Sequence, residues 1–369
     1  MDSNKINCDV VVIGAGVAGL GAASFLSHGA KVIVLEMEDQ PGYHSSGRSA
    51  ALYIEGYENP VVAGLTAASG DYFRASEHSE SPLLHDRGGL TLATIPGGSS
   101  QAQLEKYLAT WQPFCPNLGP VNVQTCMDFC PILKPEALIG GAYDPDYKGI
   151  DTHELLQTYQ RILKNNKGTL LTAQPVESLS RDGDHWLVTT PGYQVHAQWV
   201  VNAAGAWANT IADRAGIPTI DLSPLKRTAA MITAPEGAES WPIMHTLGAD
   251  LYFKPESSGI MVCPQDETPS EPMDAFADDY DVAVAMDRFA QVVNYDVQHI
   301  QHTWAGLRTF APDRYPVLGE DPRSQGFFWL AGQGGFGVQT SPALGRLTAE
   351  VILHGSALDS NISIERLVG

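Results

Sequence analysis

The stretch from residue 8 to residue 40 constrains the fold more than any other part of the sequence. It begins with Val10–Ile13, a continuous β-branched run of the kind found in parallel strands that are covered on both faces. Gly14, Gly16 and Gly19 follow and spell G-x-G-x-x-G at the expected start of a helix. The first glycine permits a turn, the second lets the backbone approach a ligand, and the third lets helix and strand pack closely. The stretch therefore predicts a β-α-β unit.

An acidic residue completes this unit. Glu36 follows the second apolar strand, Lys31–Leu35, and lies 22 residues after Gly14. An acid at this place accepts hydrogen bonds from the ribose hydroxyls of an adenosine, and a pyrophosphate sits at the positive end of the helix dipole. The unit predicts a dinucleotide site, against the alternative of a purely structural turn. The acid favours FAD or NAD over NADP, whose extra phosphate it would repel, and it does not separate FAD from NAD.

Size and composition limit the remaining possibilities. A chain of 369 residues is long enough for about two domains, and its mean hydropathy of −0.10 is that of a globular protein. The net charge of −20 argues against nucleic acid or an anionic membrane as a partner. Five cysteines are too few and odd in number for a disulfide framework, and no cysteine–histidine spacing predicts a metal site. With neither a signal peptide nor a membrane span in the pattern, we expect a cytoplasmic enzyme.

The segment from residue 39 to residue 51 is small, polar and rich in glycine and serine. In a nucleotide-binding fold, the chain after the second strand can cross back over the cofactor. The candidates to bond the pyrophosphate or the ring edges are Ser45, Ser46, Arg48 and Ser49. The alternative is a surface loop that leads into a helix expected over Pro60–Ala75.

Two further turns of small residues also precede an expected helix. The strand expected at residues 198–202 runs into a small-residue turn with Ala204 and Gly205, and a helix is expected from Ala208 to Ala215. The last turn, Gly332–Ser341, is glycine-rich and precedes a final helix expected over Pro342–Leu353. A second helix start would suit the negative end of a flavin ring, because it offers N–H groups and a positive dipole end.

The rest of the chain gives weaker signals. Strands are expected at residues 89–94, 174–179, 186–190, 224–233, 250–255, 259–263 and 327–332, and helices at residues 103–111 and 279–297. Thr152 is the expected cap of a helix that follows it, because threonine is a favoured N-cap residue. The prolines between residues 113 and 135 predict irregular structure. Because composition shifts little along the chain, we expect interleaved rather than consecutive domains.

The N-terminal G-A-G-V-A-G with Glu36 and four later stretches occur in the order found in one family of flavoproteins. The four stretches are H-S-S-G-R-S-A, V-N-A-A-G-A-W, W-A-G-L-R-T-F and G-Q-G-G-F-G-V-Q-T-S. The chain resembles the D-amino-acid oxidase superfamily, to which glycine and sarcosine oxidases belong, over essentially its whole length. Within that superfamily it looks most like the bacterial D-arginine dehydrogenase type.

The resemblance implies a non-covalent FAD and an α/β plus β fold. A Rossmann-like FAD domain of the glutathione-reductase type would be interleaved with a substrate domain built on an antiparallel sheet. The FAD domain is expected at residues 1–51, 146–220 and 301–369, and the substrate domain and active-site cover at residues 52–145 and 221–300.

The resemblance also implies a reaction and a set of residues. The reaction is oxidative deamination of a D-amino acid, with hydride passing from Cα to flavin N5 and the imino acid hydrolysing to a 2-oxo acid and ammonia. Arg308 matches the carboxylate-binding arginine, Arg227 and Tyr252 match other polar residues of that pocket, and Tyr57 matches an aromatic residue on its lid loop. The expected cofactor-binding residues are Gly14, Gly16, Ala18, Gly19, Glu36, Ser45, Arg48, Ser49, Ala50, Val176, Ala204, Gly205, Gly334, Gly335, Gly337, Gln339 and Thr340.

Two positions depart from the D-arginine type. That type has a histidine where this chain has Leu52, and a glutamate that pairs with the cationic substrate side chain where this chain has Gly89. Glu55 or Asp86 is a candidate to replace that acid. Without it, a preference for D-arginine is in doubt.

Other functions remain open at this level. A secondary amine such as sarcosine, an N-alkyl amino acid or a cyclic imino acid would suit a less polar pocket, and an arginine also binds 2-hydroxy acids. A protein of another class, an FAD-binding electron-transfer subunit of a hetero-oligomer, is a further alternative. The electron acceptor, O2 or a quinone-type carrier, and the oligomeric state do not follow from the sequence.

Overall fold

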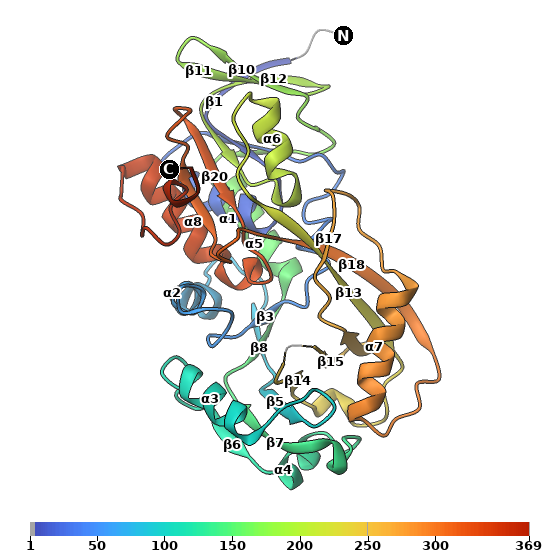
Figure 1. Cartoon of the computed structure of the whole chain (residues 1–369). Helices are drawn as coiled ribbons and strands as arrows, with labels where there is room; N and C mark the ends of the chain where they lie inside the picture. Colours follow the sequence, from blue (N-terminus) through green and yellow to red (C-terminus); the bar gives the residue numbers. More distant parts are fainter. Residues whose placement is uncertain (1–3, 249, 369) are drawn as a thin grey trace.

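The computed structural model describes residues 4–248 and 250–368. The fold is built on two large sheets and the helices that pack on them (Figure 1). The first sheet has a parallel centre in which β1 pairs with β2 and β12, β2 with β9, and β12 with β20. Its strands are β1 (Asn4–Ile13), β2 (Val32–Leu35), β9 (Thr169–Leu171), β10 (Ser178–Asp182), β11 (His185–Thr189), β12 (Tyr193–Asn202), β19 (Val317–Glu320) and β20 (Phe327–Ala331). The continuous apolar runs of β1 and β20 fit this centre because helices and loops cover both of its faces.

Helices cover the first sheet on both faces. One face carries α1 (Val17–Leu26), α2 (Pro60–Arg74), α5 (Thr152–Asn165) and α8 (Gly337–His354), and the other carries α6 (Ala208–Arg214). Helices α1 and α8 lie very close to each other. A Cβ atom added at Gly345 would come within 2.8 Å of the backbone of Gly21, so only glycine permits this approach. The tight packing brings the N-terminal ends of α1 and α8 to the same cavity.

The second sheet has nine strands and is mostly antiparallel, with one parallel pair between β14 and β5. Its strands are β5 (Gly89–Thr94), β6 (Gly119–Val121), β7 (Leu138–Asp144), β13 (Ser223–Ile232), β14 (Ile243–Thr246), β15 (Tyr252–Glu256), β16 (Gly259–Cys263), β17 (Thr268–Pro269) and β18 (Ile300–Phe310). A small third sheet joins β3 (Leu52–Tyr53), β8 (Lys148–Ile150) and β4 (Leu84–Asp86). Helices α3 (Gln101–Trp111), α4 (Val123–Phe129), α7 (Asp279–Val292) and the short α9 (Glu365–Val368) complete the fold.

The long antiparallel pair of β13 and β18 belongs to the second sheet, and in Figure 1 it extends between the two parts of the molecule. The fold class expected from the sequence is confirmed. The domain ranges stay a prediction, with one adjustment from strand pairing. Residues 301–310, expected in the FAD domain, form most of β18 and belong to the nine-stranded sheet.

Several local expectations were wrong. The cap of α5 is Asp151, whose carboxylate accepts the N–H of Glu154, and Thr152 is already the first helical residue. Helix α7 ends at Val292 rather than at residue 297, and α8 begins at Gly337, inside the stretch expected to be a turn. The proline-rich region expected to be irregular contains β6 and α4, and β10 begins four residues later than expected.

Among the residues described above, no helix combines the length and the apolarity that a membrane crossing requires. The same residues contain no group of three or more His, Cys, Asp or Glu side chains placed to hold a metal ion. All five cysteines are buried and free.

Candidate active site

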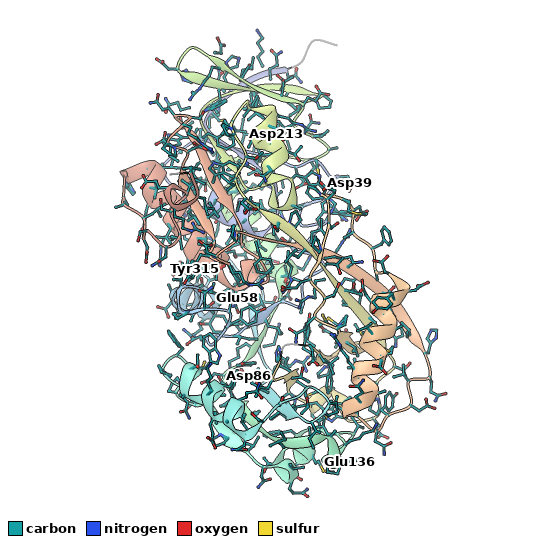
Figure 2. All side chains as sticks on the ribbon, in the orientation of Figure 1. Asp39, Glu58, Asp86, Glu136, Asp213 and Tyr315 are labelled. Carbon is teal, nitrogen blue, oxygen red and sulfur yellow. The ribbon has the colours of Figure 1, made fainter. Side chains whose placement is uncertain are left out.

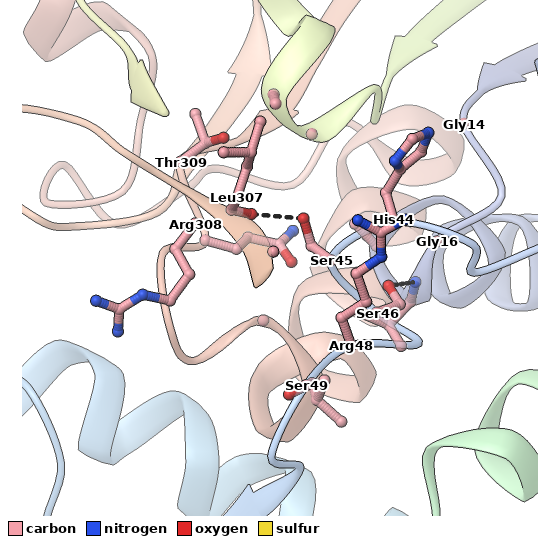
Figure 3. A pocket seen from close by; sticks show the side chains of 18 of the residues that line it. Gly14, Gly16, His44, Ser45, Ser46, Arg48, Ser49, Leu307, Arg308 and Thr309 are labelled. Carbon is pink, nitrogen blue, oxygen red and sulfur yellow. Dashed lines mark hydrogen bonds between the residues drawn. The ribbon is translucent and has the colours of Figure 1, made fainter. Parts of the chain in front are cut away.

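A cavity of about 310 Å³ lies where the carboxyl ends of β1 and β12 meet the face of the second sheet. Turns from distant parts of the sequence line it, as Figure 3 shows for the loop after β2 and for β18. Nearly all of the residues expected from the sequence border this cavity. Those that border it are Gly14, Gly16, Ala18, Glu36, Ser45, Arg48, Ser49, Ala50, Tyr57, Val176, Ala204, Gly205, Arg227, Tyr252, Arg308, Gly334, Gly335, Gly337 and Gln339.

The first glycine turn leaves no room for side chains. Gly14 has a φ of +102°, and a Cβ atom there would lie 2.5 Å from the carbonyl oxygen of Ala203. Gly19 does not line the cavity. A Cβ atom on it would lie 1.9 Å from the carbonyl oxygen of Gly14, so its absence lets α1 pack on the turn. The turn therefore holds the N-terminus of α1 open to the cavity.

Glu36 closes this turn from the side. Its carboxylate accepts the N–H of Ala15 at 2.6 Å and that of Glu38 at 3.0 Å, and the side chain also faces the cavity. An ionised carboxylate is a strong acceptor for backbone N–H groups and for hydroxyl groups alike. Glu36 thus stands where an adenosine ribose can be held.

The loop after β2 lies between the first turn and β18 (Figure 3). Ser46 accepts the N–H of Val17 at 3.0 Å and so caps an otherwise unpaired donor of α1, while Ser45 donates to the carbonyl of Leu307. Ser49 accepts the N–H of Ala51 at 3.0 Å.

Arg48, from the same loop, reaches away from the first turn. Its guanidinium bonds Asp274 at 2.5 Å and the carbonyls of Ala275 and Ala305 at 2.7 and 3.1 Å. These contacts fasten the loop to β18 and to residues 274–275. Ala50, two residues on, is held through its carbonyl by Lys254 Nζ at 2.6 Å.

The last glycine turn supplies the second helix start. The side chain of the cap residue Phe336 forms no hydrogen bond with the first turn of α8. The N–H groups of that turn are therefore available to a ligand in the cavity. Gln339 borders the cavity and accepts the N–H of Ile54 at 2.9 Å. Thr340 does not border the cavity; its side chain is buried, and its hydroxyl donates to the carbonyl of Phe336 within the helix.

Arg227 and Arg308 lie on neighbouring strands at the wall of the cavity. In the register of β13 and β18, Arg227 pairs with Gly306 and Arg308 with Leu225, which makes the two arginines diagonal neighbours on one face. The alternation of the strand sends Lys226 to the opposite face, where it pairs with Asp278 and Asp281. Of the two adjacent basic residues, only the arginine therefore faces the cavity.

Glu267 is a neighbour of these arginines that sequence reasoning missed. Its carboxylate bonds Arg308 Nη2 at 2.6 Å, Arg314 Nη2 at 3.1 Å and Arg227 Nη2 at 3.4 Å. Burial opposes ionisation of this acid, but the hydrogen bond from Arg314 and the charge of Arg308 outweigh it and lower the pKa of Glu267. In contrast, Arg308 Nε is buried and has no hydrogen-bond partner among the described residues.

His245 is the second residue that was missed. It lies on β14 opposite Tyr252 of β15, and the two rings stack at 5.6 Å between centroids. Burial lowers the pKa of His245 to about 4 and keeps the ring neutral, and its Nε2 has no partner in the part of the chain that the structure covers. Burial raises the pKa of Tyr252, so its hydroxyl stays protonated and can donate a hydrogen bond.

Of the two departures from the D-arginine type, Leu52 borders the cavity, whereas Gly89 lies behind its lining, next to Tyr147, which contacts the lining residue His245. A Cβ atom added at Gly89 would lie 2.0 Å from the ring of Tyr147, so this ring fills the space where an acidic side chain would begin. Leu52 borders the cavity with an apolar side chain. Neither proposed substitute acid lines it: Glu55 bonds Tyr53, and the exposed Asp86, labelled in Figure 2, pairs with Lys148.

The site fits FAD on three observations. Two helix N-termini open onto one cavity, the glycine turns leave space for close backbone approach, and Glu36 faces the cavity beside the first turn. One helix start suits the pyrophosphate and the other suits the electron-rich edge of a flavin ring.

Comparisons with known proteins agree with this assignment. The chain is similar to mouse dimethylglycine dehydrogenase, with 23% identity over 381 residues that cover 95% of this chain and 43% of that protein. It thus spans less than half the length of that relative. Glycine oxidase of Geobacillus kaustophilus is 23% identical over 93% of this chain and 92% of its own.

Solved structures share the fold. The crystal structure of the G. kaustophilus glycine oxidase matches with a TM-score of 0.85 and 22% identity over 98% of this chain and all of that one. L-proline dehydrogenase from P. horikoshii matches with a TM-score of 0.82 and 20% identity over 97% and 95% of the two chains. Residues 9–351 match the family described as DAO, FAD dependent oxidoreductase. The chain belongs to this family of FAD-dependent oxidoreductases.

Proposed function

We propose that the protein oxidises the carbon–nitrogen bond of an α-amino acid with an uncharged side chain, with a D-amino acid as the leading candidate. The observation that carries the proposal is the guanidinium of Arg308, which faces the cofactor cavity and whose buried Nε has no hydrogen-bond partner in the described part of the chain. An arginine can hold a carboxylate by two parallel charge-assisted hydrogen bonds, which fixes both its charge and its orientation. Fixing the reacting carbon in this way lowers the barrier through orientation alone.

The wall residues have separate roles in this proposal. Arg308 binds the carboxylate, and Tyr252 donates a further hydrogen bond from its protonated hydroxyl. Neutral His245 adds no charge that would repel the amine. FAD, when bound, accepts the hydride equivalent from Cα. The imino acid then leaves and is hydrolysed by water to a 2-oxo acid and ammonia.

We relate the side-chain preference to the ring of Tyr147, which packs edge-on against the cavity residue His245. This ring occupies the space beside Gly89, and no acid of this wall is available for a substrate guanidinium. Glu267, the acid in contact with Arg308, already bonds three arginines. We therefore propose neutral amino acids, and not D-arginine, as the preferred substrates.

A secondary amine is the second candidate. Met261 and Trp304 join the aromatic residues of the cavity, and such a wall accommodates N-alkyl groups or a ring. Names of similar proteins, dimethylglycine dehydrogenase and L-proline dehydrogenase, point to substrates of this kind.

The test is anaerobic bleaching of the flavin absorbance by D-alanine, L-alanine, D-arginine, sarcosine, proline and lactate. We expect D-alanine or sarcosine to bleach faster than D-arginine, and the absence of bleaching by every amine would refute the proposal. Arg308→Ala should weaken capture of all carboxylate substrates while FAD stays bound. Reoxidation of the bleached enzyme by air or by a soluble quinone then identifies the electron acceptor.

A further inference from the structure

We propose that Glu267 is an internal carboxylate that competes with the substrate carboxylate for Arg308 and so sets the affinity of the site for carboxylates. The inference rests on the proposed function, because it takes Arg308 as the carboxylate-binding residue. Glu267 would be a specificity-determining residue, and it lies between β16 and β17, outside the glycine turns.

The first observation is the short contact between Glu267 and Arg308, the proposed carboxylate-binding residue. Glu267 Oε1 lies 2.6 Å from Arg308 Nη2, which is the shortest of its contacts with guanidinium groups. A substrate carboxylate at Arg308 meets this negative charge directly. Either it displaces Glu267 or it binds beside a like charge, and both outcomes weaken its binding.

The second observation is that the contact with Arg308 is dispensable for Glu267. Its Oε1 receives donors from three guanidinium groups, more than the two lone pairs of one carboxylate oxygen accommodate well. Arg314 alone bonds both oxygens, with Nη1 at 3.2 Å from Oε2 and Nη2 at 3.1 Å from Oε1. When Glu267 leaves Arg308, this two-donor pair with Arg314 remains, so no buried charge is left unpaired.

The third observation is where Glu267 comes from. The side chain of Glu267 is 35% exposed and that of Arg308 is 13% exposed, so the acid approaches the arginine from the solvent side. The neighbouring Asp266 is fixed, because its carboxylate accepts the N–H of Thr228 at 2.7 Å and the hydroxyl at 3.0 Å. Glu267 therefore changes partners by side-chain rotation, without release of its backbone.

Ion pairs also connect Glu267 to the loop that carries Tyr57. Arg314 also forms an ion pair with Glu58, the residue after Tyr57. The series Glu58, Arg314, Glu267 and Arg308 thus connects this loop to the carboxylate site. Occupation of Arg308 by substrate shifts Glu267 toward Arg314, on the side of the Tyr57 loop.

The experiment measures the affinity of the FAD-loaded protein for acetate by isothermal titration calorimetry. In Glu267→Gln we expect acetate to bind roughly three- to tenfold more tightly, in the range for removing a partly exposed charge competitor. Glu267→Ala, which removes the side chain altogether, should shift affinity in the same direction. The neutral analogue acetamide should bind equally to all variants.

Glu271→Gln is the matched control, because it removes the same charge from the same segment, and Glu271 is exposed and forms no ion pair with any residue that the structure describes. Its acetate affinity should equal that of the unmodified protein. Unchanged or weaker acetate binding in both Glu267 variants would overturn the proposal, since it would mean that Glu267 supports Arg308 rather than competing for it. Loss of acetate binding in Arg308→Ala would then still support the proposed function, whereas unchanged binding there would refute that function itself.

Discussion

In the proposed function the fit of Tyr147 against Gly89 disfavours a basic substrate, and this fit can be tested through stability. Gly89→Ala places a methyl group 2.0 Å from Cδ2 and 2.4 Å from Cε2 of the Tyr147 ring, where ordinary contacts begin near 3.4 Å. The ring is buried, forms a hydrogen bond to Tyr107 at 3.3 Å and contacts His245 edge-on, so it moves only at the expense of these contacts. We expect a loss of about 2 kcal/mol in the free energy of unfolding.

A double-mutant cycle isolates the contact. Tyr147→Ala alone should cost about 3–5 kcal/mol, as for other large buried aromatic residues. In the double variant the methyl group no longer meets the ring, so its cost should fall about 2 kcal/mol below the sum of the two single costs. The assay is urea unfolding of the FAD-loaded protein, followed by flavin and tryptophan fluorescence.

Gly64→Ala is the control for the effect of alanine itself. A Cβ atom there meets nothing within 4 Å, and Gly64 lies on an exposed face of α2. This change should stabilise the protein by up to about 1 kcal/mol. Additivity within about 0.5 kcal/mol at positions 89 and 147 would refute the steric account of the missing acid.

Three further predictions concern the cofactor site and the wall. Glu36→Gln should raise the dissociation constant for FAD about ten- to hundredfold, because a charge-assisted acceptor beside the first turn is lost. Titration of the cofactor-free protein with FAD measures this constant. An unchanged constant would contradict the role of the acid. Gly19→Ala should destabilise the protein by more than about 3 kcal/mol and abolish FAD retention, because the added Cβ would lie 1.9 Å from the carbonyl oxygen of Gly14. A variant that retains FAD through gel filtration would contradict this prediction. His245 carries a pKa lowered from about 6.5 to about 4, so the unfolded chain takes up a proton between these values while the folded protein does not. Stability is therefore lost as the pH falls through this window, by at most about 3 kcal/mol and by less to the extent that the ring borders the cavity. In His245→Asn this part of the loss should disappear, and parallel stability curves for both proteins between pH 7 and pH 4 would exclude the effect.

The sequence predicted the parts of the site that depend on local patterns. The glycine turn, Glu36 and the Gly334–Gly335 turn are each recognisable within one strand–turn–helix unit, and all of them border the cavity. Strand alternation left open which of Lys226 and Arg227 faces inward, and the register of β13 with β18 answers it.

The missed residues depend on pairing between distant segments. His245 joins the wall because β14 pairs with β5 on one side and β15 on the other, and no local pattern identifies this order. Glu267 acts on Arg308 across 41 positions of sequence, on a segment without periodicity. The adjacent Asp151 and Thr152 are both good N-cap residues, so composition alone does not select the one that caps α5.

The close packing of α1 on α8 affects how the protein is made. Gly14 is synthesised roughly 300 residues before Gln339, an interval on the order of 15–60 s at typical rates of translation. During this time the first helix has no Gly345 beside Gly21, and the nascent site lacks the helix start that faces a flavin ring. In the proposed site FAD gains its full set of contacts only when α8 docks. At a free concentration of about 100 times its dissociation constant, FAD then adds about 2.7 kcal/mol to the stability of the folded protein. A chain that ends before Gly334 lacks α8, and we therefore expect it to lose cofactor retention and folding stability together.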